Sequence, residues 1–73
     1  MKAYKYQNEI ILLNNAQKID CYDTGSGAKS NPHNYTVRVH FGANDYQTLH
    51  LGKISEEEKD FVLNEIFNII IAQ

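Results

Sequence analysis

Arg38, His40 and His50 are the side chains of this sequence best suited to act together on a ligand, because they are cationic or titratable and separated by even numbers of residues. Residues two apart on a strand share a face. Two histidine nitrogens can share a metal ion if a carboxylate joins them. Arg38 would lie inside such a set and repel a cation, and no second pair of ligands has metal spacing. We therefore expect no metal, and interpret these residues, with Tyr46 beside them, as a polar sheet face.

The tetrapeptide at residues 23–26, Asp-Thr-Gly-Ser, resembles the catalytic turn of aspartic proteases. In those enzymes a dimer brings two such carboxylates together to share one proton and activate water. The proteases flank the motif with apolar strands and support it with a second apolar-Gly element, whereas polar residues 27–32 follow it here. A polar turn is the favoured interpretation, and a dimeric aspartic protease acting through Asp23 is a remote alternative.

The glycines at 25 and 27 also suggest a phosphate-binding loop, in which backbone amides and a lysine hold anionic oxygens. Such a loop needs glycine directly before the lysine and a helix directly after it. Here Ala28 precedes Lys29, and Pro32 follows closely. We therefore expect no nucleotide and no other cofactor.

Length and composition predict one small globular domain covering residues 1–73, with 42% apolar and 22% charged residues. The formal charge of −2 lacks the basic excess that duplex DNA binding needs. The single cysteine, Cys21, cannot form an internal disulfide and is interpreted as a small core residue, which favours the cytoplasm. The apolar run at 10–13 is too short for a signal peptide or a membrane span.

Hydrophobic periodicity predicts the elements that must position these residues. Alternating or apolar runs predict strands at about 9–13, 16–23, 35–41 and 46–52, with a mobile loop at 24–34. A helix is expected at about 55–72. Tyr4 and Tyr6, alternating with Lys5, either begin the first strand earlier or form an additional edge strand. The expected fold is α+β: an antiparallel meander of three to four strands with one C-terminal helix packed on one face.

The hairpin formed by the last two strands has a register that can be predicted, because opposed residues must share a face. A three-residue loop at 43–45 is a common hairpin length. It predicts that four apolar side chains are buried together and that Arg38 and His50 are exposed opposite each other. The expected pairs are Val39 with Leu49, Val37 with Leu51, Arg38 with His50, and His40 with Thr48.

The C-terminal helix begins with a capping box, in which the Ser55 hydroxyl accepts from the Glu58 amide. One arc of the helix can cover the sheet, with Lys59 at its edge. Further large apolar residues remain outside this arc and predict a homodimer through the helix. In the alternative, Phe67 and Ile71 fold against Tyr4 and Tyr6. The covering residues are Val62, Leu63, Ile66, Ile69 and Ile70, and the remaining ones, taken as an interaction surface, are Phe61, Phe67 and Ile71.

The order of features, an Asn- and Ile-rich meander, an acidic helix start at 56–58 and an amphipathic end, resembles the small uncharacterised accessory proteins of low-GC Gram-positive bacteria and their phages. This resemblance implies a cytoplasmic accessory protein without a specified activity. The chain also resembles the single-stranded DNA-binding coactivator fold, in which strands precede a dimerising C-terminal helix. That family uses basic strand residues, and this chain offers Arg38, Lys18 and Lys29.

The leading hypothesis is a non-catalytic interaction module that binds a protein partner, of which a phage-derived inhibitor of a host system would be one form. It depends on the excess of apolar helix residues and on the lack of a catalytic constellation. The alternative is a single-stranded nucleic-acid binder whose polar sheet face stacks bases and contacts phosphates. The residues of that alternative are Tyr46, Tyr35, Arg38, His40 and His50.

Overall fold

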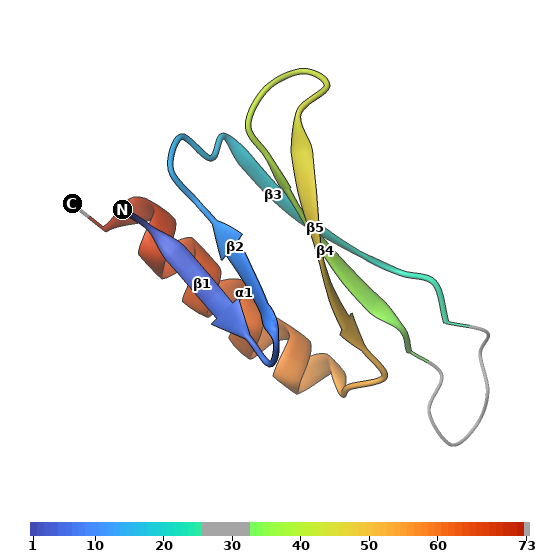
Figure 1. Cartoon of the computed structure of the whole chain (residues 1–73). Helices are drawn as coiled ribbons and strands as arrows, with labels where there is room; N and C mark the ends of the chain where they lie inside the picture. Colours follow the sequence, from blue (N-terminus) through green and yellow to red (C-terminus); the bar gives the residue numbers. More distant parts are fainter. Residues whose placement is uncertain (26–32, 73) are drawn as a thin grey trace.

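The computed structural model describes residues 1–25 and 33–72. Within these residues the chain forms five antiparallel strands in two sheets, followed by one helix (Figure 1). The predicted α+β class is confirmed, and the predicted element bounds agree with the observed ones to within two residues. The elements are β1 (Ala3–Tyr6), β2 (Glu9–Leu12), β3 (Lys18–Asp23), β4 (Tyr35–His40), β5 (Tyr46–Gly52) and α1 (Glu56–Ile71).

The first sheet is the hairpin of β1 and β2, so the alternation of Tyr4 and Tyr6 marks an additional strand. Tyr6 pairs with Glu9 across the tight turn at residues 7 and 8. Gln7 adopts a positive φ of 54°, a region that favours glycine in turns of this kind. Ile11 points into the core, whereas Ile10 and Leu12 stay exposed.

The second sheet is a meander in the order β3-β4-β5, with β4 in the centre. Ile19 and Cys21 of β3 lie opposite Val39 and Val37. The two sheets meet where β2 contacts β5, and the His50 amide donates to Glu9 Oε2 at 3.4 Å. The described residues therefore leave β3 at the outer edge of its sheet, away from the hairpin.

The predicted register between β4 and β5 is wrong by two residues. Val37 pairs with Leu49, and Val39 pairs with Gln47. The reason is the position of the loop: the Phe41 amide donates to the Asp45 carbonyl at 2.7 Å, which closes a three-residue loop one residue earlier than expected. A shift of two preserves which side chains share a face, so the predicted joint burial of Val37, Val39, Leu49 and Leu51 is confirmed.

The same shift corrects the polar pairs. Arg38 lies opposite Thr48 instead of His50, and His50 lies opposite Thr36. His40 lies opposite Tyr46 instead of Thr48. Arg38 is half-buried rather than exposed. These corrections separate Arg38 from His50 and bring Arg38 nearer to Tyr46.

The helix α1 begins at the predicted cap, where Ser55 Oγ accepts from the Glu58 amide at 3.1 Å. It runs alongside the β1–β2 hairpin (Figure 1) and closes the core against both sheets. Lys59 lies at the edge of the covering arc, with its Nζ 5.4 Å from the centre of the Tyr35 ring. The buried apolar core consists of Ile11, Leu13, Tyr35, Val37, Val39, Leu49, Leu51, Val62 and Ile66.

The end of α1 lies beside the start of β1. The last turn of the helix has no basic residue of its own. Lys2 supplies one from the other end of the chain, because its Nζ donates to the Ile70 carbonyl at 2.7 Å. A cation at this position satisfies a free carbonyl and complements the helix dipole.

Candidate functional site

The solvent-facing side of the β3-β4-β5 sheet, here called the outer sheet face, carries the candidate site. Alternation along each strand and the observed registers arrange its side chains in three rows across the sheet. The apolar side chains between them point the other way, into the core. From row to row the residues are Lys18, His40 and Tyr46; then Asp20, Arg38 and Thr48; then Tyr22, Thr36 and His50.

Arg38 lies at the centre of the outer sheet face, between two tyrosine rings. Its guanidinium carbon is 4.8 Å from the centre of the Tyr22 ring and 5.2 Å from that of Tyr46. Tyr46 remains 51% exposed and Tyr22 38% exposed. The sequence prediction included Arg38 and Tyr46 but omitted Tyr22, which the observed pairing of β3 with β4 places on this face. The contacts on both sides limit the freedom of the arginine side chain.

Asp20 provides the negative charge of the outer sheet face. Its Oδ2 lies 3.2 Å from His40 Nε2 and 4.0 Å from Lys18 Nζ. Its Oδ1 lies 3.9 Å from Arg38 Nε, beyond hydrogen-bond distance, and neither of these two buried atoms has a hydrogen-bond partner among the described residues. The carboxylate thus offsets part of the charge of Arg38 without a hydrogen bond between Oδ1 and Nε.

His40 and His50 lie on the outer sheet face, as predicted, but in different rows. The His40 ring centre is 5.8 Å from that of Tyr46, and His50 Nδ1 lies 3.3 Å from Thr36 Oγ1. Each histidine therefore has its own neighbours. Among residues 1–25 and 33–72, no three His, Cys, Asp or Glu side chains gather in a way that could hold a metal ion.

Tyr35, which the nucleic-acid hypothesis placed on the same surface, lies on the opposite side of the sheet. It is buried in the core, and burial raises the pKa of its hydroxyl. Its assignment to the stacking surface was therefore wrong. Cys21 also points inward and packs partly buried against the core, in accord with the interpretation of a small core residue. Burial raises the pKa of its thiol and so disfavours the reactive thiolate.

The predicted apolar interaction surface divides into two parts. Phe61, Phe67 and Ile71 are 63%, 49% and 56% exposed. Phe67 and Ile71 are one turn apart, whereas Phe61 lies about 120° around the helix from Phe67. Phe67 and Ile70 line a pocket with residues 16–19 at the start of β3. We call Phe67, Ile70 and Ile71 the helix flank; of these residues, Phe67 and Ile70 adjoin the start of β3.

Asp23, the carboxylate of the protease-like tetrapeptide, closes the base of the β3–β4 connection. The amides of Asn34 and Gly25 both donate to its Oδ1 at 2.8 Å, and His33 Nδ1 lies 2.8 Å from its Oδ2. The Asn34 amide first, and then His33 and Gly25, lower the pKa of Asp23 to about 2. The carboxylate is thus ionised and engaged by its own loop. The predicted mobility of the loop concerns mainly residues 26–32, which lie outside the described residues.

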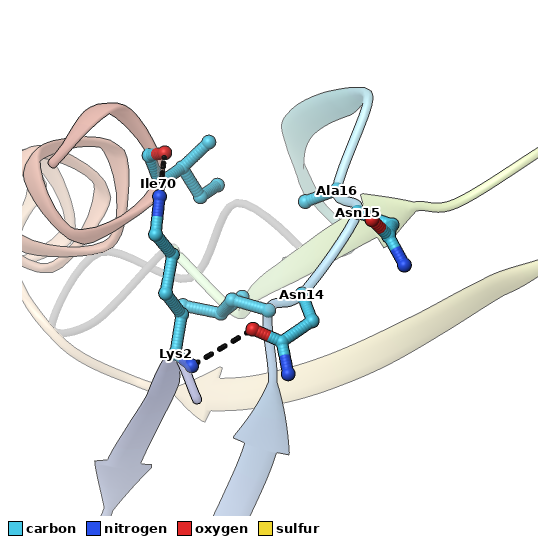
Figure 2. A pocket seen from close by; sticks show the side chains of 6 residues that line it. Lys2, Asn14, Asn15, Ala16 and Ile70 are labelled. Carbon is cyan, nitrogen blue, oxygen red and sulfur yellow. Dashed lines mark hydrogen bonds between the residues drawn. The ribbon is translucent and has the colours of Figure 1, made fainter. Parts of the chain in front are cut away.

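Figure 2 shows a pocket between the start of β1, the turn after β2 and the end of α1. The Lys2 amide donates to Asn14 Oδ1 at 2.9 Å, while its ammonium donates to Ile70. The pocket thus holds the Lys2 ammonium against the end of α1, where one of its three N–H donors is used. Its other lining residues are Leu13, Asn15 and Ala16.

Comparison of the chain with protein-family models, curated proteins and solved structures finds no match. The resemblance to small phage and Gram-positive accessory proteins therefore stays a prediction. Within the described residues, no helix has the length and apolar character needed to cross a membrane.

Proposed function

We propose that this protein is a non-catalytic protein-interaction module that binds its partner through the outer sheet face. The observation that carries the proposal is Arg38, held between the exposed rings of Tyr22 and Tyr46. Tyrosine and arginine are among the residue types that most often supply the binding energy of protein interfaces. A cytoplasmic accessory protein, with a phage-derived inhibitor of a host system as one form, is the biological setting we propose for it.

The geometry favours binding because the central side chains are already ordered. Tyrosine loses little conformational entropy on binding, and an arginine stacked on both sides loses less than a free one. Asp20, on the neighbouring strand β3, places its carboxylate beside the arginine. A partner that offers a carboxylate or a backbone carbonyl can accept from the exposed part of the Arg38 guanidinium, since this side chain keeps 33% of its surface exposed.

Single-stranded nucleic acid is the second candidate ligand, and the same surface supports it. Exposed Tyr22 and Tyr46 offer planar faces for base stacking, and Arg38 and Lys18 offer cations for phosphates. Asp20 opposes this candidate, since its carboxylate lies among those cations. The protein-binding proposal is therefore preferred.

The test is affinity capture from the native host with tagged wild-type protein and three variants. Tyr46→Ala and Arg38→Gln alter the outer sheet face, while Phe61→Ala removes an exposed aromatic ring on the far side of the molecule. We expect one protein to be retained by wild type and by Phe61→Ala, and to bind the two face variants at least about tenfold more weakly. A partner that binds all three variants equally well would contradict the proposal.

Salt and nuclease distinguish the two candidate ligands. Binding to nucleic acid falls steeply with salt concentration, because phosphate contacts release counterions. We expect the captured protein to survive nuclease treatment and to lose little affinity between about 50 and 200 mM salt. Capture abolished by nuclease, together with steeply salt-dependent binding of an oligothymidine probe that Tyr46→Ala weakens, would favour the nucleic-acid candidate instead.

A further inference from the structure

The edge of β3 presents backbone groups that can pair with another strand. β3 has β4 on one side and no strand on the other among the described residues. The Thr24 amide donates to the Asn34 carbonyl at the end of the ladder, and alternation then directs the backbone groups of every second residue from Tyr22 to Lys18 towards β4. The amide and carbonyl groups of Ile19 and Cys21 therefore point away from the sheet.

An apolar surface adjoins this edge. Phe67 and Ile70 line a pocket together with residues 16–19, and Phe67 and Ile71 are about half exposed. A strand added to β3 would thus lie beside the helix flank, and its inward-facing side chains would cover it. This combination of free backbone groups and adjacent apolar side chains is the arrangement used for strand addition.

The charges of β3 indicate which strand fits. If two copies of β3 pair antiparallel across a two-fold axis at Ile19, Lys18 of each copy lies opposite Asp20 of the other. Opposite charges in directly opposed positions stabilise a sheet, and like charges destabilise it. A shift by one residue on each strand would place Asp20 opposite its own copy. β1, an edge strand of the two-stranded sheet, carries Lys5 as its one charged residue and has no such complementarity.

We infer that a second copy of this chain binds the edge of β3, so that the two three-stranded sheets join into one. Ile19 exchanges its backbone hydrogen bonds with the partner's Ile19, and two Lys18 to Asp20 pairs form on the outer sheet face. On the other side, Phe67 and Ile71 pack against the partner's helix flank. This places the dimer at a strand edge supported by the helix, rather than on the helix alone. The inference does not depend on the proposed function.

The test is sedimentation of wild type and matched charge variants between about 1 and 100 μM, which measures dimer dissociation constants within that range. Lys18→Glu places a carboxylate opposite the partner's Asp20, and Lys5→Glu makes the same change of charge on exposed β1. We expect wild type and Lys5→Glu to form dimers of equal affinity, and Lys18→Glu to dimerise at least about tenfold more weakly. Circular dichroism checks that each variant is folded.

Amide hydrogen exchange supplies a second measurement on the unmodified protein. Protection of the Ile19 amide should rise with protein concentration by a larger factor than that of Val37, which lies inside the sheet and gains only what dimerisation adds to the global stability. Wild type that stays monomeric at 100 μM would overturn the inference. Equal weakening by both charge variants, or a dimer that is broken by Phe61→Ser and unaffected by Lys18→Glu, would also overturn it.

Discussion

Ile66 is the most deeply buried residue of α1, and its truncation should cost a large part of the stability of this domain. Its side chain is 0% exposed and belongs to a core supplied by β2, β4, β5 and α1. Ile66→Ala removes three buried carbons, which costs about 2 to 5 kcal/mol including the cavity that remains. A domain of 73 residues has a total stability of about 4 to 11 kcal/mol. The variant should therefore lose about half of its free energy of unfolding.

Urea unfolding followed by circular dichroism measures this loss, at a fixed low protein concentration because dimerisation would add stability. Ile66→Val should cost about 0.5 to 1.5 kcal/mol. Phe61→Ala, on the same helix but 63% exposed, should stay within about 0.5 kcal/mol of wild type. The slope of the free energy with urea should not change. Equal losses for Ile66→Ala and Phe61→Ala would refute the described docking of α1.

Three further predictions concern single contacts. Tyr4→Phe removes the hydroxyl that donates to Glu65 Oε1 at 3.0 Å and should cost about 0.5 to 1.5 kcal/mol. Because burial and then Glu65 raise the pKa of Tyr4 from 10.0 to about 12, wild type should lose this advantage as pH rises through that range; identical alkaline unfolding of both proteins would contradict this. Asp23 has its pKa lowered from 3.8 to about 2, so its contribution is present above pH 3.8 and lost as pH falls through about 2; exchange of the Asn34 amide should accelerate there in wild type and show no such step in Asp23→Asn. Gln7→Gly should raise the unfolding free energy by up to about 1 kcal/mol, since Gln7 has φ of 54°, and a decrease would argue against that turn geometry.

The secondary structure was predictable because its signals are local. Alternation in β3 and β4 and the Ser55 cap with Glu58 each depend on a few neighbouring residues. The register of β4 with β5 was not predictable in this way. Residues 42–45 accommodate a three-residue loop in two positions, and both positions bury the same apolar side chains. A register shift by an even number of residues leaves each side chain on the same face of the sheet, so the pattern of burial is the same in both registers. The choice between those registers depends on the loop conformation.

The sequence predicted which side chains of the candidate site share one side of the sheet, but not which of them are neighbours. Alternation placed Arg38, His40, Tyr46 and His50 on one side of the sheet, as observed. The position of Tyr22 beside Arg38 depends on how β3 aligns with β4 across a long connection, and no local pattern encodes that alignment. The contact of Phe67 and Ile70 with residues 16–19 likewise depends on where β3 begins relative to α1.

The contact between Lys2 and Ile70 means that the ends of the fold could be covalently connected. Lys2 and Ile70 are 68 positions apart in sequence, and their side chain and carbonyl lie 2.7 Å apart. A short flexible linker could therefore join α1 to β1, and the chain could be opened at the exposed loop 42–44 to give a circular permutant. In that permutant the contacts between β1 and α1 become local in sequence, so it should retain the native fold and form these contacts earlier during folding.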